Sequence, residues 1–191
     1  MNKKYKIVAL FGPAGSGKDY IQWHLMHTDC GDNYLHKIVS CTTRPPRERE
    51  INGINYYFVS EEEFKKKDFL EYTTFRNWWY GTPVDSLDIN KINVGIFNTA
   101  GIHQLINSDI SERVDCLPIY IKTNPRIRLL RQLQRENEPD CDEIIRRYLT
   151  DQKDFENLTF SYKVIENNTD EVKPILSEII EEICDWAFSD K

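Results

Sequence analysis

The feature that most constrains the fold is a glycine-rich segment near the N-terminus, Gly12-Pro13-Ala14-Gly15-Ser16-Gly17-Lys18. It follows an apolar run, Lys6 to Phe11, whose lack of polar alternation is typical of a strand buried on both faces, and it precedes a helical stretch. Glycines let consecutive N–H groups turn inward around a phosphate, and the helix N-terminus adds partial positive charge. Lys18 can reach the β and γ oxygens of a triphosphate. The pattern therefore predicts a phosphate loop, residues 12–18, rather than a turn that serves packing alone.

The residue after this lysine departs from the usual motif. A Ser or Thr that ligates magnesium normally stands there, whereas this chain has Asp19. A carboxylate is a harder Mg²⁺ ligand than a hydroxyl, but it also places negative charge near the phosphates. Asp19 equally suits the first turn of a helix, where an acid complements the dipole. We keep both interpretations, and Asp19 is the candidate metal ligand.

Further apolar runs alternate with helical patterns along the chain. The runs lie at Ile38 to Thr43, Val94 to Phe97, Leu117 to Lys122 and Lys163 to Ile165. Helices are expected after Gly17, after a capping box formed by Ser60 and Glu63, after Pro125, and over Val172 to Trp186. This alternation predicts an α/β fold with a parallel sheet flanked by helices. The stretch from Arg44 to Pro83 does not fit it and indicates an insertion with short strands of its own.

Composition limits the domain count and the classes of partner. A chain of 191 residues that is 40% hydrophobic predicts a single domain, 1–191, with one core. Its net charge of −6 disfavours non-specific binding to nucleic acid or to an anionic membrane. Five scattered cysteines indicate reduced thiols, and the apolar run Ile7 to Phe11 is too short for a signal peptide or a membrane span. A cytoplasmic location is therefore expected.

A second group of residues suits a nucleoside monophosphate. Arg44 and Arg47 are separated by two prolines that stiffen the turn, which gives a fork suited to a phosphate. Glu71 follows an apolar pair and is a candidate base reader, because guanine presents N1–H and its 2-amino group side by side as donors, whereas adenine presents an acceptor at N1. Taken alone, arginines beside Glu48 and Glu50 also fit a solvated charged loop.

With these motifs together, the chain resembles the guanylate kinases from about Lys6 to about Asn168. The resemblance rests on the phosphate loop, Ser40 to Arg47, Asn52-Gly53 through Phe58-Val59-Ser60, Phe69-Leu70-Glu71 and Tyr80-Gly81-Thr82. It implies a P-loop kinase core with a parallel sheet flanked by helices, an inserted monophosphate-binding segment and a small helical lid. The inserted segment corresponds to 42–83 and the lid to 126–150.

The resemblance also implies roles for individual residues. Those expected to hold the GMP phosphate are Ser40, Arg44, Arg47, Tyr56 and Tyr80, and those expected to read the base are Glu71 and Thr82. The ATP site is expected to comprise Gly12, Pro13, Ala14, Gly15, Ser16, Gly17, Lys18, Asp19 and, near the adenine, Asn167. The catalytic cations would be Lys18, Arg44, Arg131, Arg135 and one of Arg146 or Arg147, with Arg147 preferred.

Helical spacing adds one expectation for the arginine-rich helix after Pro125. Arg128, Arg131 and Arg135 are spaced at i, i+3 and i+7, which predicts that they share one face. A solvated helix face is the alternative explanation of this spacing.

Two positions depart from the family pattern. After the strand Val94 to Phe97 the family usually carries two aspartates spaced by one residue, where this chain has Ile96 and Asn98. Asn98 can still hydrogen-bond to guanine without supplying charge, so it remains a candidate for GMP binding. Asp19 could offset the missing carboxylate near Mg²⁺.

The resemblance thus implies transfer of the γ-phosphoryl group of ATP to GMP or dGMP, with Mg²⁺, by a monomer or homodimer that binds neither nucleic acid nor membrane. Two alternatives stay open. One is a kinase of the same fold with altered or broader (deoxy)nucleotide specificity, motivated by Ile96 and Asn98. The other is an inactive guanylate-kinase-like binding module, against which the intact loop and Lys18 argue.

Overall fold

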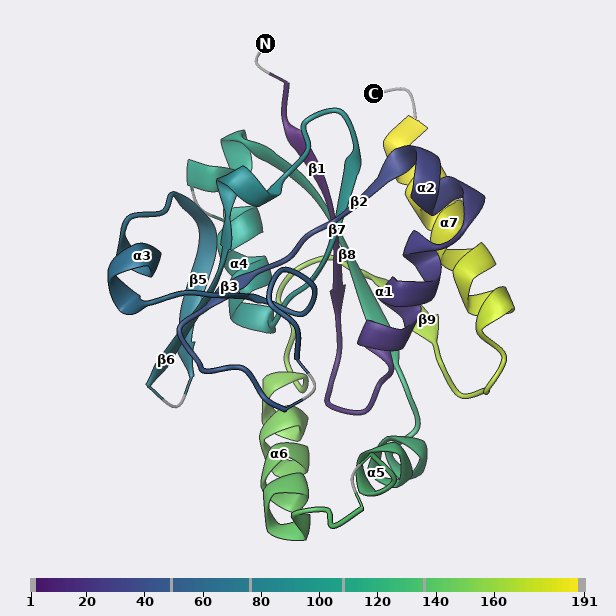
Figure 1. Cartoon of the computed structure of the whole chain (residues 1–191). Helices are drawn as coiled ribbons and strands as arrows, with labels where there is room; N and C mark the ends of the chain where they lie inside the picture. Colours follow the sequence, from purple (N-terminus) through teal and green to yellow (C-terminus); the bar gives the residue numbers. More distant parts are fainter. Residues whose placement is uncertain (1–2, 49, 76, 108, 136, 189–191) are drawn as a thin grey trace.

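A five-stranded parallel sheet forms the centre of the protein. The structure, a computed structural model, describes residues 3–48, 50–75, 77–107, 109–135 and 137–188. The sheet contains β1 (Tyr5–Phe11), β2 (Leu35–Lys37), β7 (Ile92–Ile96), β8 (Val114–Lys122) and β9 (Lys163–Glu166). Its order is β2-β7-β1-β8-β9, and every neighbouring pair is parallel (Figure 1). The α/β fold with a parallel sheet is therefore confirmed.

Helices cover both faces of this sheet. Those on one face are α1 (Lys18–Met26), α2 (Asp29–Tyr34) and α7 (Val172–Phe188), and α4 (Thr99–Asn107) lies on the other (Figure 1). Along β1, Val8 and Leu10 pack into the first core cluster, and Ile7, Ala9 and Phe11 into the second. All five side chains are fully buried, which explains the absence of polar alternation in this run. No helix in the described ranges is long and apolar enough to cross a membrane.

The expected strand Ile38 to Thr43 is wrong. The strand β2 ends at Lys37, and the chain then crosses to a second sheet, where β3 (Cys41–Thr42) pairs antiparallel with β6 (Trp78–Pro83). Ile38 and Cys41 are both buried, but beside different sheets. The apolar run was taken for one strand because burial alone does not identify the sheet in which a residue pairs.

The second sheet occupies the segment expected to be an insertion, 42–83, except that its first strand begins one residue earlier, at Cys41. It contains β3, β4 (Tyr57–Phe58), β5 (Phe69–Phe75) and β6 (Trp78–Pro83) in the order β4-β3-β6-β5. The helix α3 (Glu61–Lys65) begins at Ser60, whose side chain forms the expected capping box with Glu63. A bulge between Phe69 and Glu71 shifts the register of β5, so that Glu71 lies opposite Thr82 of β6. Short 3₁₀ turns, Val84–Ser86 and Asp109–Glu112, complete the connections.

Two helices project from the end of the protein opposite to the start of β1, beyond the carboxyl ends of the parallel strands (Figure 1). They are α5 (Pro125–Leu133) and α6 (Cys141–Asp154), and together we call them the helix pair. Asn124 caps α5 by accepting from Arg126 N, and Asp140 caps α6 by accepting from Glu143 N. The carboxyl ends of the strands, the phosphate loop and the helix pair therefore meet at one end of the molecule.

Candidate active site

The phosphate loop connects β1 to α1 and needs glycine for two separate reasons. Gly15 and Gly17 both have a left-handed backbone, with φ of 76° and 91°. They also lie against neighbours: a Cβ on Gly15 would be 2.6 Å from the Arg128 carbonyl oxygen, and one on Gly17 would be 2.5 Å from Asn167 Nδ2. A side chain at either position would displace the loop or its support.

Side-chain donors hold the carbonyl groups of this loop. Lys18 Nζ donates to Gly12 O at 2.7 Å and to Pro13 O at 3.1 Å. Ser16 O accepts from Asn167 Nδ2 at 2.8 Å and from Thr123 Oγ1 at 3.1 Å. Burial lowers the pKa of Lys18 below its usual value, and the carboxylates of Asp19 and Asp151 partly offset that effect. Because its partners are neutral carbonyls, Lys18 keeps its charge available to an anion in the loop.

A cavity of about 330 Å³ opens beside the start of α1. It is lined by Gly17, Tyr20, Arg131, Asn167, Thr169, Asp170 and Val172. The Arg131 Nη1 atom is buried and has no hydrogen-bond partner among the described residues, although Nη2 donates to Thr169 O at 3.4 Å. A buried guanidinium nitrogen with no partner is costly, so it favours a bound acceptor at this position. Arg131 and Asn167, both expected near ATP, therefore meet here.

The expectation that three arginines share one helix face is wrong for Arg135, whereas Arg128 and Arg131 both approach the phosphate loop. Arg128 is 7% exposed and bonds Ala14 of the phosphate loop. Arg131 lines the cavity beside α1, whereas Arg135 lies beyond the last residue of α5, Leu133, and lines a different cavity. Helical spacing could not predict this, because the helix ends before Arg135 and a distant partner holds Arg128.

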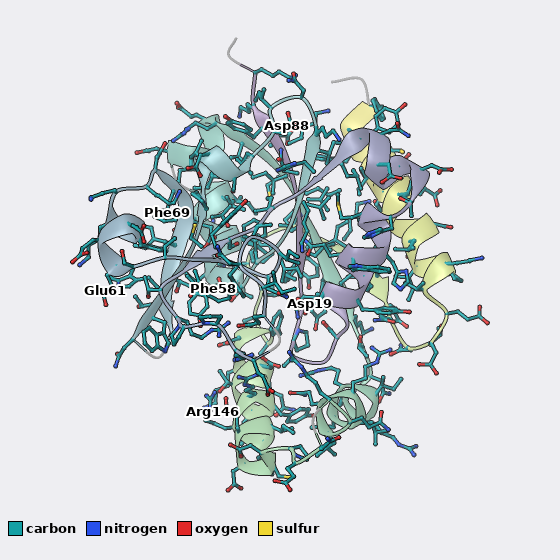
Figure 2. The ribbon with its side chains drawn as sticks, in the orientation of Figure 1. Asp19, Phe58, Glu61, Phe69, Asp88 and Arg146 are labelled. Atoms are coloured by element: carbon teal, nitrogen blue, oxygen red, sulfur yellow. The ribbon has the colours of Figure 1, made fainter. Side chains whose placement is uncertain are left out.

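The second cavity, of about 230 Å³, lies between the helix pair and the turn that carries Arg47. Its lining residues are Arg47, Gln132, Arg135, Pro139, Asp140, Glu143, Ile144 and Arg147. Three arginines expected to contact phosphates thus gather around one space. Arg146 is absent from the lining and lies on the side of α6 away from α5 (Figure 2).

A carboxylate bonds two arginines of α6. Glu143 accepts from Arg147 Nε at 2.8 Å and from Arg146 Nε at 2.7 Å. These hydrogen bonds, of which that from Arg146 has the largest effect, hold the pKa of Glu143 far below its usual range. Glu143 therefore stays ionised at any ordinary pH and keeps Arg147 beside the cavity.

Arg44 is held by a second carboxylate rather than left in solvent. Its Nη2 lies 2.8 Å from Glu50 Oε1, and its guanidinium lies over the rings of Tyr56 and Phe58, at 5.8 and 5.7 Å. The other oxygen of Glu50 accepts from Arg47 N at 2.8 Å. The Arg44 and Glu50 side chains are 12% and 17% exposed, so a solvated charged loop does not describe Arg44, whereas Arg47 and Glu48 are exposed. The ring of Tyr80 lies 6.0 Å from that of Tyr56.

The expected base readers form a hydrogen-bonded row. Thr82 Oγ1 donates to Glu71 Oε1 at 2.7 Å, and the Ser40 and Thr82 hydroxyls are 3.2 Å apart. The pairing of β6 with β3 on one side and β5 on the other produces this row. Glu71 is 7% exposed, and burial raises its pKa from the ordinary value to about 7. The ionised form of such a buried carboxylate is stabilised when it accepts hydrogen bonds from two donors of a ligand.

The two positions that depart from the family pattern have different surroundings. Ile96 packs against the core at the end of β7. Asn98 Oδ1 accepts from Gly101 N at 2.7 Å and so caps α4, a role that the sequence analysis missed. A Cβ on Gly101 would lie 2.9 Å from Glu71 Oε2 and 3.3 Å from Asn98 Oδ1. Asn98 and Glu71 therefore approach the same point at the start of α4.

Asp19 stands at the first turn of α1, exposed to solvent, as its sequence position predicts (Figure 2). Its charge acts on the pKa values of Lys18 in the loop, of Tyr56 in the expected monophosphate site, and of Lys37 at the end of β2. Among the residues that the structure describes, no group of three or more His, Cys, Asp or Glu gathers to hold a metal. One carboxylate beside a phosphate loop still fits Mg²⁺, which takes most of its ligands from phosphates and water.

Three acidic residues have supporting roles that were not predicted from the sequence: Glu50, Glu143 and Asp151. Glu50 lies six residues from Arg44 and Glu143 four from Arg147, so local charge spacing could have indicated both pairs. Asp151 contacts Ala14 across 137 positions, and nothing local marks it.

Comparison with known proteins agrees with this geometry. The family model for guanylate kinase matches residues 4–183. The chain is 34% identical to a guanylate kinase of Malacoplasma penetrans, over 93% of this chain and 95% of that protein. It is 31% identical to one of Helicobacter pylori strain J99, over 94% and 88%. The structure resembles a crystal structure of guanylate kinase from Anaplasma phagocytophilum, with a TM-score of 0.67 and 18% identity, over 99% of this chain and 89% of that one. The matches to the family model and to the curated relatives establish that the chain belongs to the guanylate kinase family.

Proposed function

We propose that the protein is a guanylate kinase, which transfers the γ-phosphoryl group of ATP to GMP or dGMP and releases ADP and GDP or dGDP. Family membership makes the chain a nucleoside monophosphate kinase. The observation that carries the guanine assignment is the buried carboxylate of Glu71, bonded on one oxygen by Thr82.

Guanine suits this carboxylate because it offers two adjacent donors, N1–H and the 2-amino group. Adenine would place an acceptor at N1 against Glu71, and like partners in a buried site repel. Since Glu71 has a pKa of about 7, binding of a double donor would also favour its ionised form at neutral pH. The same carboxylate therefore selects guanine and becomes charged by binding it.

The reaction requires alignment of the two phosphates and positive charge around them rather than a strong base. The accepting phosphate is already ionised, so the protein must align it with the donor and stabilise the equatorial oxygens. We assign this to Lys18, Arg44, Arg131, Arg135 and Arg147. The proposal is supported by the cavities that Arg131, Arg135 and Arg147 line, by Glu143, which bonds Arg147 beside one of them, and by Glu50, which bonds Arg44.

Mg²⁺, when bound, would neutralise charge on the donor phosphates. Asp19 is the carboxylate that we propose as its protein ligand, directly or through water. Asp19→Ser should raise the Mg²⁺ concentration needed for half-maximal rate and weaken Mg²⁺-dependent ADP binding by severalfold. An unchanged magnesium titration in both measurements would leave Asp19 as a helix first-turn acid.

The segments 42–83 and 126–150 would close over the two substrates and exclude water, which otherwise competes as acceptor. We expect a monomer or homodimer in the cytoplasm that binds neither nucleic acid nor membrane. The five cysteines, all free thiols, suit a reducing compartment.

The test is ADP formation from ATP and Mg²⁺ with GMP, dGMP, AMP, CMP, UMP and dTMP offered separately. Lys18→Ala protein supplies the background. We expect turnover with the guanine acceptors only. Turnover with several bases would instead favour a kinase of broader specificity, as Asn98 allows. No turnover with any acceptor would contradict the proposal and favour a binding module.

A further inference from the structure

The lid side of the phosphate loop is held by a closed ring of three hydrogen bonds. Asp151 Oδ2 accepts from Ala14 N at 2.7 Å and from Arg128 Nη2 at 3.1 Å. Arg128 Nε in turn donates to Ala14 O at 3.0 Å. The two peptide units that flank the Ala14 Cα are therefore fixed by two side chains of the helix pair.

This ion pair is buried, unlike most of those on the protein surface. The Arg128 and Asp151 side chains are 8% and 18% exposed, whereas those of Lys122 and Glu166 are 57% and 59% exposed. The ring of Tyr148 lies 5.3 Å from the Arg128 guanidinium. A buried pair is costly to build unless its remaining hydrogen-bonding atoms are also satisfied, and here Ala14 supplies one further partner to each side chain.

The pair also occupies the base of the helix pair. Arg128 lies in the first half of α5, and Asp151 lies in the last turn of α6. The remainder of both helices therefore extends away from this point. The backbone of α5 touches the loop as well, because a Cβ on Gly15 would be 2.6 Å from Arg128 O. A displacement of the helix pair about its base would be transmitted to Ala14.

A glycine-rich loop benefits from such support. Its glycines permit several backbone conformations, while anion binding needs one set of N–H directions. Lys18, Thr123 and Asn167 fix the carbonyls of Gly12, Pro13 and Ser16, and Arg128 completes the series at Ala14. Because Arg128 neutralises Asp151, the support adds no net charge beside a triphosphate.

We infer that Arg128 and Asp151 are positioning residues for the phosphoryl donor: they fix the Ala14 peptides and so connect the shape of the phosphate loop to the helix pair. This inference rests on the proposed function, because it takes the ligand of the loop to be a nucleoside triphosphate. The affinity for the nucleoside monophosphate, which is proposed to bind at the second sheet, should not change when either residue is substituted.

The test compares donor and acceptor binding in Asp151→Ala protein. We expect Kd for ADP and KM for ATP to rise about tenfold, as for the loss of a charged hydrogen bond, with Kd for GMP within about twofold of the parent value. Asp151→Asn keeps an acceptor for Ala14 N and should lose less. In amide hydrogen exchange, Ala14 should lose protection in the alanine variant without any nucleotide present.

Unfolding of the variant is controlled in two ways. Removal of Asp151 alone leaves Arg128 buried without its partner, so Arg128→Met with Asp151→Ala removes both charges together. This double variant should fold like the parent and still bind ADP about tenfold more weakly. Glu182→Ala breaks a separate ion pair, with Lys163, and should leave both constants unchanged.

The inference is overturned if ADP binding and Ala14 exchange are unaffected in the double variant, or if ADP and GMP binding weaken equally. Failure of the proposed function gives a different result. In that case the parent protein forms no GDP from ATP and GMP, while the hydrogen exchange of Ala14 still depends on Asp151.

Discussion

The phosphate loop and the proposed base-reading row, Glu71 and Thr82, are built in opposite ways. The loop consists of seven consecutive residues, and its binding groups are backbone N–H groups directed by glycine and by bonds to its carbonyls. The row consists of side chains from two strands, Glu71 and Thr82, with the Ser40 hydroxyl, expected at the phosphate, beside Thr82; strand pairing brings them together. The first depends on local conformation, whereas the second depends on the register of a sheet.

The cations around the two substrates are also held by different groups. Lys18 bonds neutral carbonyls, and its burial lowers its pKa. Arg44 and Arg147 bond carboxylates, Glu50 and Glu143, which keep them in place before any nucleotide arrives. The loss of Lys18 should therefore affect the reaction itself, whereas the loss of a supporting acid should mainly weaken substrate binding.

The largest effect is expected from Lys18→Ala. The variant should lose about 100-fold to 1,000-fold in kcat, because a cation that stabilises the transferred phosphoryl group is removed. Its affinity for GMP, measured by calorimetry, should stay within about twofold of the parent. An equal loss of GMP affinity would show that the two regions are not separate and that the role given to Lys18 is wrong.

Glu71→Gln should have the next largest effect, on the acceptor side alone. The amide presents a donor where guanine also presents donors, so kcat/KM for GMP should fall about 10-fold to 100-fold while KM for ATP is unchanged. Glu62→Gln, the same change at an exposed position of α3, is the control. Retained preference for GMP in the Glu71 variant would remove this residue from base reading.

The pKa of Glu71 predicts a pH effect of opposite sign on binding and on stability. Binding needs the carboxylate, so KM for GMP should rise about tenfold as pH falls from 8 to 6. The phosphate of GMP titrates in the same range, so Glu71→Gln serves as the reference. For the unliganded protein the folded pKa is raised from 4.5 to about 7, so the stability contributed by this group falls as pH rises through that interval.

Glu50→Ala should give the smallest effect, about a fivefold rise in KM for GMP with kcat nearly unchanged. The change frees Arg44 and the Arg47 N–H from the carboxylate that positions them. Glu48→Ala removes an exposed acid of the same turn and is the matched control. Equal effects of the two substitutions would indicate that only the net charge of the turn matters.

The same contrast explains how much of the molecule the sequence could predict. The phosphate loop, the capping box at Ser60 and the final helix depend on residues close in sequence, and the structure contains all three. The strand Ile38 to Thr43 was wrong because the partners that decide it are distant, and Arg135 does not share the face of Arg128 and Arg131 because α5 ends before it. The bulge before Glu71, which sets it opposite Thr82, also had no local signal.

Selection of guanine by Glu71 is best tested by competition between acceptors in one tube. Equimolar GMP, CMP and UMP are offered with ATP and Mg²⁺, and the diphosphates are separated by chromatography; AMP is omitted because its product is also the product of the donor. We expect GDP in at least about 100-fold excess over CDP and UDP, since neither cytosine nor uracil offers the buried carboxylate two adjacent donors. Comparable amounts of the three diphosphates would contradict it.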